Sequence, residues 1–198
     1  DYQFQKPITA WNESSPQAHW RNRRIEQPFF SVFNLGITHE SQVWRQKDNP
    51  LLIDRDLNVP VPPYLPRTEI ALNDIRQVYS NIVAMDKQVG VILNELEEDG
   101  LLESTIVFFY SDHGGPLPRQ KRLLYDSGIL VPLIIRYPDK WRAGEIDDQL
   151  ISFVDFKSTT LSLAGIQPPS YVDGRAFVGE FADASPRNYI LSLIHISE

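Results

Sequence analysis

Two side chains that could hold a metal ion, Asp112 and His113, follow directly on an apolar run at residues 105–110. In open α/β sheets ligands bind outside the carboxyl ends of strands, so Asp112 and His113 are candidate metal ligands. A carboxylate suits a hard cation and an imidazole can fill one coordination position. The two glycines that follow would let the backbone approach a ligand closely. In the alternative interpretation, Asp112 caps a turn and His113 is an ordinary loop residue.

A basic segment lies just beyond this pair. Arg119, Lys121 and Arg122 place three cationic side chains within four residues. Next to a bound dication they would concentrate positive potential, draw in an anionic substrate and hold its oxygens by charge-assisted hydrogen bonds. We expect Arg119 and Arg122 to be charges at the rim. A solvated basic loop is the alternative.

The elements that must position these residues can be predicted from the apolar pattern. Residues 67–98 carry apolar side chains at a spacing of three to four, with a proline before and Gly100 after, which predicts a long helix. Asp155 could cap a last helix over residues 156–164 that ends at Gly165. Strands are predicted at residues 28–34, 105–110, 131–135 and 151–153. This order predicts an α/β fold whose largely parallel sheet is flanked by helices.

Composition sets the outer bounds. The 198 residues suit one domain, and 42% hydrophobic and 23% charged residues are ordinary for a globular protein. The net charge of -7 argues against a nucleic-acid partner, which requires a basic face. The chain has no cysteine, so disulfides are excluded and the redox compartment stays open. No apolar run is long enough for a membrane span. Because residue 1 is Asp, the lack of a signal peptide gives no information about location.

Residues 111–136 resemble the sulfatase branch of the alkaline-phosphatase superfamily. The positions that fall in the family's pattern are Asp112, His113, Lys121, Tyr125, Asp126, Gly128, Val131 and Pro132. Further stretches with the same resemblance are residues 28–34 with 38–40, 85–90, 153–155, 163–166 and 173–174. The form of residues 38–41, Thr-His-Glu-Ser, is similar to bacterial carbohydrate sulfatases related to heparan sulfamidases.

The resemblance implies a role for each matching residue. Asp112 and His113 would be two ligands of Ca²⁺. Lys121 would contact the sulfate oxygens, and His39 would bind the sulfate or help to protonate the leaving group. For His39, a loop histidine turned to solvent is the alternative. His19 could touch a substrate sugar, although packing at the surface explains it equally.

The resemblance also implies boundaries. Residues 1–190 would form part of a sulfatase catalytic domain, an incomplete alkaline-phosphatase-like sandwich whose N-terminal half lies upstream. Residues 191–198 resemble the translation of a sequencing adapter, so we expect a non-native tail and exclude His195 from any site.

Family sulfatases use a formylglycine nucleophile made from Cys or Ser in a Cys/Ser-x-Pro/Ala-x-Arg motif, which this sequence does not contain. We therefore expect this polypeptide alone to be inactive. The implied partners are a sulfated carbohydrate and a formylglycine-generating maturase that acts on the N-terminal half. A periplasmic or secreted location is favoured by the family.

Two other functions remain open. The first is a phosphomonoester or phosphonate-ester hydrolase of the same superfamily, which the nucleophile segment would discriminate. The second is a non-catalytic binding domain, in which Asp112 and His113 only shape a loop; calcium titration would discriminate it.

Overall fold

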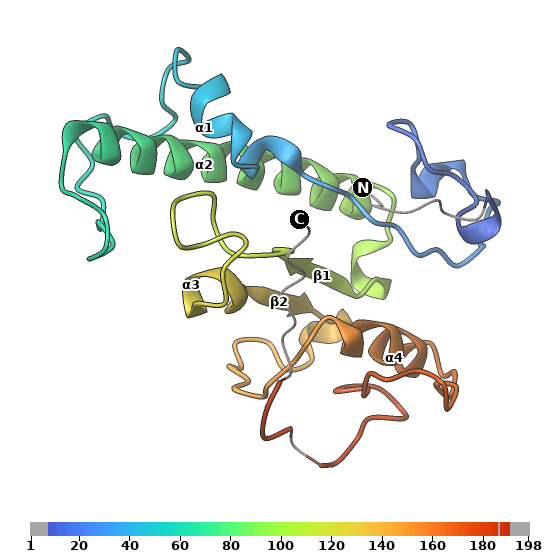
Figure 1. The fold of residues 1–198 in the computed structure, drawn as a ribbon. Helices are drawn as coiled ribbons and strands as arrows, with labels where there is room; N and C mark the ends of the chain where they lie inside the picture. The colour runs from blue at the N-terminus through green and yellow to red at the C-terminus, as the bar shows by residue number, and fades with distance from the viewer. Residues whose placement is uncertain (1–7, 186, 191–198) are drawn as a thin grey trace.

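The computed structural model describes residues 8–185 and 187–190, so the predicted tail at 191–198, with His195, lies outside the described part. Its elements are η1 (Ile8–Ala10), η2 (Trp20–Asn22), η3 (Gly36–Thr38), α1 (Ser41–Arg45), α2 (Glu69–Glu98), η4 (Leu102–Ser104), β1 (Val107–Tyr110), α3 (Asp126–Ile129), β2 (Leu133–Arg136), η5 (Pro138–Lys140) and α4 (Val154–Leu163). The α/β class predicted from the sequence is confirmed. Helix α2 spans the molecule, with β1 and β2 beside it and α4 on the far side of the strands (Figure 1). Within these ranges, no helix combines the length and the apolar character that crossing a membrane requires.

Helix α2 is confirmed close to its predicted bounds. Thr68 caps its start by accepting a hydrogen bond from the Ala71 amide at 3.3 Å, and Gly100 follows its end with φ of +68°. Its buried side is more polar than the sequence predicted. Gln77 and Asn81 are buried and joined by a 2.9 Å hydrogen bond, whereas Ile82 of the predicted apolar stripe is exposed.

The parallel sheet is not confirmed. Strands β1 and β2 form an antiparallel pair, with Val107 opposite Arg136 and Tyr110 opposite Leu133. A parallel pair needs a crossover of about a dozen or more residues, usually a helix. The connection, residues 111–132, is long enough for a crossover, but it contains only the four-residue α3 and no packed crossover helix, and the chain returns beside β1 in the opposite direction.

Two predicted strands are wrong for the described structure, since residues 28–34 and 151–153 are not assigned to any strand. An apolar run becomes a strand only when another strand offers its backbone groups as partners. Phe30 and Val32, expected in the core, are 64% and 47% exposed. At the second site, the Ser152 amide donates to the carboxylate of Asp155 at 2.9 Å. Asp155 lies inside α4, whose N-cap is Phe153, so the prediction that Asp155 caps this helix is wrong.

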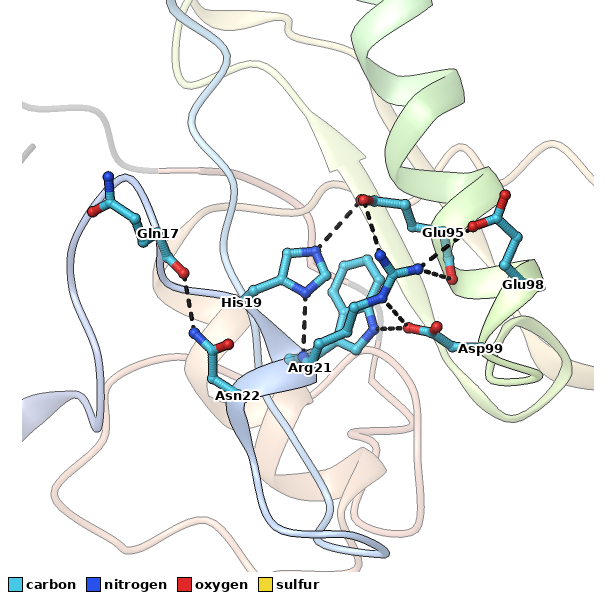
Figure 2. A network of polar contacts seen from close by, with 8 residues as sticks. Gln17, His19, Arg21, Asn22, Glu95, Glu98 and Asp99 are labelled. Carbon is cyan, nitrogen blue, oxygen red and sulfur yellow. Dashed lines mark hydrogen bonds and ion pairs between the residues drawn. The ribbon is translucent and has the colours of Figure 1, made fainter.

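The N-terminal segment is bound to the C-terminal end of α2 by the polar network in Figure 2. The Arg21 guanidinium lies 2.8 Å from Asp99 and 3.2 Å from Glu95, and the Trp20 indole N–H donates to Asp99 at 2.7 Å. Hydrogen bonds from Arg21 and Trp20 hold the pKa of Asp99 below its ordinary value. His19 stacks on Trp20 at 4.0 Å and lies 3.4 Å from Glu95, so its contacts here are structural. This network offsets the unfavourable placement of acidic side chains at a helix C-terminus.

We expect Trp20→Ala to lower the free energy of unfolding by about 3–5 kcal/mol, because Trp20 is only 2% exposed and its loss leaves a cavity. Trp44→Ala is the matched control: Trp44 is 59% exposed, and we expect a change of roughly 0.5 kcal/mol or less. Urea denaturation of the purified variants measures both, and equal losses would contradict the packing role of Trp20.

Candidate active site

Asp112 and His113 lie at the end of β1, where the sequence predicted them. The His113 Nδ1 is 2.7 Å from the carbonyl oxygen of Gly114. Because a carbonyl only accepts, this contact places the ring proton on Nδ1 and leaves a lone pair on Nε2. That Nε2 is 3.6 Å from Asp112 Oδ2, and the Asp112 side chain is 82% exposed. The carboxylate of Asp112 and Nε2 of His113 therefore lie next to each other, and each carries lone pairs that a metal ion could accept.

The loop that follows is folded back on itself through its glycines. The Gly114 amide donates to the Gly128 carbonyl at 2.8 Å, and the Lys121 amide donates to the Gly115 carbonyl at 3.1 Å. A Cβ on Gly128 would lie 2.1 Å from the Leu123 carbonyl oxygen, so only glycine fits there. This folding returns Lys121 to a point beside Gly115, two residues after His113.

His39 meets Lys121 across 82 residues of sequence: the distance from Lys121 Nζ to His39 Nε2 is 3.3 Å. His39 follows η3, and η3 and α1 both pack on α2. The structure thus brings together the two residues predicted to contact sulfate. His39 is exposed, and its ring contacts Lys121 and Ser41.

The proton of His39 is directed toward Lys121. The Ser41 amide donates to His39 Nδ1 at 3.2 Å, which makes Nδ1 an acceptor and places the proton of the neutral ring on Nε2. Lys121 Nζ and His39 Nε2–H are then two donors that face each other. An oxygen of an anion can accept from both, so this pair is suited to an oxyanion.

Glu40 is also part of the site, and the sequence analysis did not predict a role for it. Its carboxylate lies 3.8 Å from Lys121 and 2.8 Å from Arg122, and its side chain is 20% exposed. Partial burial alone would raise the pKa of Glu40, but the positive charges of Lys121 and Arg122 outweigh it and lower the pKa. Glu40 therefore stays ionised and positions the basic segment. Its place in the sequence next to His39 was the only sign of this role.

The donor set fits part of a calcium shell. Asp112 offers carboxylate oxygens and His113 an imidazole lone pair whose tautomer is set by a backbone carbonyl, as is usual for metal-bound histidine. Among the described residues there is no group of three or more His, Cys, Asp or Glu side chains arranged to hold a metal. Asp112 and His113 could therefore supply two ligands, and a complete shell would need more.

Comparison with known proteins points to one family. The sulfatase family profile matches residues 15–166. An ulvan-active sulfatase of Formosa agariphila is 46% identical, over 96% of this chain and 37% of its own length. Human N-sulphoglucosamine sulphohydrolase is 36% identical over 58% of this chain and 23% of its own length. A solved structure from work on glycosaminoglycan metabolism by Bacteroides thetaiotaomicron superposes with a TM-score of 0.51 at 28% identity, over 84% of this chain and 34% of that one. The chain thus spans well under half of each of these relatives.

We expect Gly128→Ala to destabilise the protein by about 2 kcal/mol or more, because the new Cβ collides with backbone carbonyls and opens the loop. Gly90→Ala is the matched control: Gly90 lies within α2 with open space around its Cβ position, so we expect a gain of about 0.5–1 kcal/mol. Thermal unfolding measures stability, and limited proteolysis at residues 114–128 reports the loop. A loop that stays protected in Gly128→Ala would contradict this account.

Glu40→Gln should lower thermal stability at pH 7 because Lys121 and Arg122 lose their counter-charge. The pKa of Glu40 is depressed in the folded state, so its contribution is fully present above its ordinary pKa of 4.5 and is lost as pH falls through the lower, folded value. Melting curves of wild type and Glu40→Gln should therefore converge only at strongly acidic pH. Glu97→Gln, at an exposed position near the end of α2, is the control and should melt like wild type at every pH.

Proposed function

Since the chain belongs to the sulfatase family, we propose that it forms the part of a sulfatase active site that binds the sulfate group of a sulfated carbohydrate. The observation that carries the proposal is the pair of opposed donors, Lys121 Nζ and His39 Nε2–H, at 3.3 Å. A sulfate oxygen satisfies both donors at once. The ammonium of Lys121 contributes the charge, which stabilises the negative oxygens as the S–O bond breaks.

His39 has a second task in this proposal. Its Nε2–H points to where the sulfate is bound, so it can donate a hydrogen bond to the oxygen that leaves with the sugar. Nδ1 accepts from the Ser41 amide, which keeps the ring oriented during this donation. A hydrogen bond of this kind would stabilise the negative charge that develops on the leaving oxygen, without transfer of the Nε2 proton.

Asp112 and His113 would hold calcium, with further ligands from the rest of the protein. Bound calcium would neutralise negative charge on the sulfate ester and on the attacking group. Two contacts within this chain would orient the site: the Gly114 carbonyl fixes the His113 tautomer, and the glycine-dependent loop bonds the Lys121 amide to the carbonyl of Gly115, two residues after His113.

The nucleophile is proposed to come from another part of the protein, since this chain spans 37% of the ulvan-active sulfatase. It would be a formylglycine, made by a maturase that acts on that other part. A carbohydrate substrate is supported by the substrates of relatives, among them an N-acetylglucosamine-6-O-sulfatase of Bacteroides thetaiotaomicron that is 36% identical over 50% of this chain.

The test uses the full-length protein. We expect it to release inorganic sulfate from a sulfated carbohydrate far faster than it releases phosphate from the corresponding phosphate ester, as ion chromatography measures. Asp112→Ala should weaken calcium binding at least about tenfold in isothermal titration, because a charged ligand is lost. The control is Asp148→Ala, at an exposed aspartate outside the site, and it should bind calcium like wild type.

Unchanged calcium affinity in Asp112→Ala would overturn the metal assignment. Faster turnover of the phosphate ester would overturn the proposed reaction.

A further inference from the structure

Arg119 is one of two arginines of the basic segment whose backbone is held in an unusual conformation; the other is Arg122, with φ of +73°. The φ of Arg119 is +63°, in the left-handed region that non-glycine residues rarely adopt. The Ser127 hydroxyl donates to the Arg119 carbonyl at 2.6 Å and so ties the two sides of the loop together at this point. The direction in which Arg119 leaves the loop is therefore fixed by the fold.

Two tyrosine rings hold the Arg119 guanidinium. Its central carbon lies 5.3 Å from the ring centroid of Tyr64 and 5.8 Å from that of Tyr125. Tyr64 precedes α2 and Tyr125 precedes α3, so the rings come from different segments. Contacts with ring faces leave the N–H groups at the edge of the guanidinium plane available, and these are the groups that bind carboxylate or sulfate with two parallel hydrogen bonds.

The charge of Arg119 is not offset within the described part of the chain. Lys121 and Arg122 share the carboxylate of Glu40, but none of the ion pairs between described residues includes Arg119. An exposed cation with fixed direction and no carboxylate partner is a site for an anion from outside the chain. Since it lies two residues from Lys121, that anion would be close to the sulfate held by Lys121 and His39.

There is also room for a sugar next to Arg119. The segments that carry Tyr64 and Arg119 line a cavity of about 250 Å³, with Leu65, Pro66 and Ile70 on one side and Leu117 and Pro118 on the other. Thr68 and Asp74 of the first side add a hydroxyl and a carboxyl group to the lining. The apolar part of these walls suits the C–H face of a sugar ring.

Resting on the function proposed above, we propose that Arg119 is a specificity-determining residue that binds a second anionic group of the substrate. That group, a carboxylate or a further sulfate, lies on the sugar adjacent to the ester that is cleaved. The substrate class is thus an oligosaccharide with at least two neighbouring negative charges. The alternative is a purely structural role, in which Arg119 only attaches the loop to the segment before α2 through Tyr64. Loss of such a role would lower activity on all substrates equally.

The experiment compares three sulfated disaccharides with the full-length enzyme. All carry the same cleavable sulfate ester; the neighbouring sugar has a free uronate carboxylate, its neutral methyl ester, or a second sulfate. For wild type we expect kcat/KM to be higher with either anionic neighbour than with the methyl ester. In Arg119→Gln the ratio of anionic to neutral substrate should fall about tenfold or more, the value of a lost charge-assisted hydrogen bond. The arm with the larger fall identifies carboxylate or sulfate as the preferred group.

Two further variants make the result specific. Arg119→Lys keeps the charge and shows whether the loop still folds. It should retain part of the preference for anionic substrates because of its charge, and lose the rest because it lacks the planar guanidinium. Arg24→Gln removes an exposed arginine from the N-terminal segment, which is bound at the opposite end of α2, and it should keep the wild-type ratio.

An unchanged ratio of anionic to neutral substrate in Arg119→Gln would overturn the inference. If activity falls equally on all three substrates, Arg119 only positions the loop. Either result leaves the proposed sulfatase function standing. Failure of wild type to cleave any sulfate ester would remove both.

Discussion

The arrangement on which the rest of the site depends is a pair of hydrogen-bond donors that face each other without an acceptor between them. Lys121 Nζ and His39 Nε2 come within 3.3 Å although 82 residues separate them in sequence. Such a pair would repel if left alone, so the fold must hold it. Glu40 does so with its negative charge, and the Ser41 amide does so by fixing the His39 ring. An oxygen of an anion can accept from both donors, and the proposed sulfate site rests on this arrangement. The two histidines have opposite tautomers, with a proton presented by His39 and a lone pair presented by His113. One ring is suited to an anion and the other to a cation.

Charge is separated along α2, although the chain as a whole is acidic with a net charge of -7. At its N-terminal end the helix lies near the basic loop, since Ile70 and Leu117 line one cavity. At its C-terminal end Glu95, Glu98 and Asp99 are gathered around Arg21 (Figure 2). Thirty helical residues span about 45 Å, so the acidic end is many Debye lengths from the loop and does not oppose anion binding there. The distance explains how an acidic protein can keep a cationic site.

The strands show how much of this fold depends on partners. Residues 28–34 carry the apolar composition of a strand but form no ladder, and Phe30 and Val32 remain exposed. On β2, Ile134 is exposed as well. Helix α2 needs no such partner, because every backbone bond of a helix is made within its own segment. This difference is the reason that the long helix was predicted nearly to the residue while the sheet was not.

The sequence by itself determined the local features: the start and end of α2 from Pro66 and Gly100, the place of Asp112 and His113 at the end of a strand, and the sulfatase resemblance over residues 111–136. The structure, in contrast, showed why residue 128 must be glycine, since there is no room for a Cβ. Tertiary structure alone decided that β1 and β2 run antiparallel, that Glu40 joins Lys121 to Arg122, that His19 packs against Trp20, and that Arg119 lies between Tyr64 and Tyr125. The physical reason is range. Caps, turns and helical periodicity act over a few neighbouring residues and can be predicted from the chain, whereas strand direction, ion pairs and ring contacts join segments far apart in sequence and exist only once the whole chain has packed.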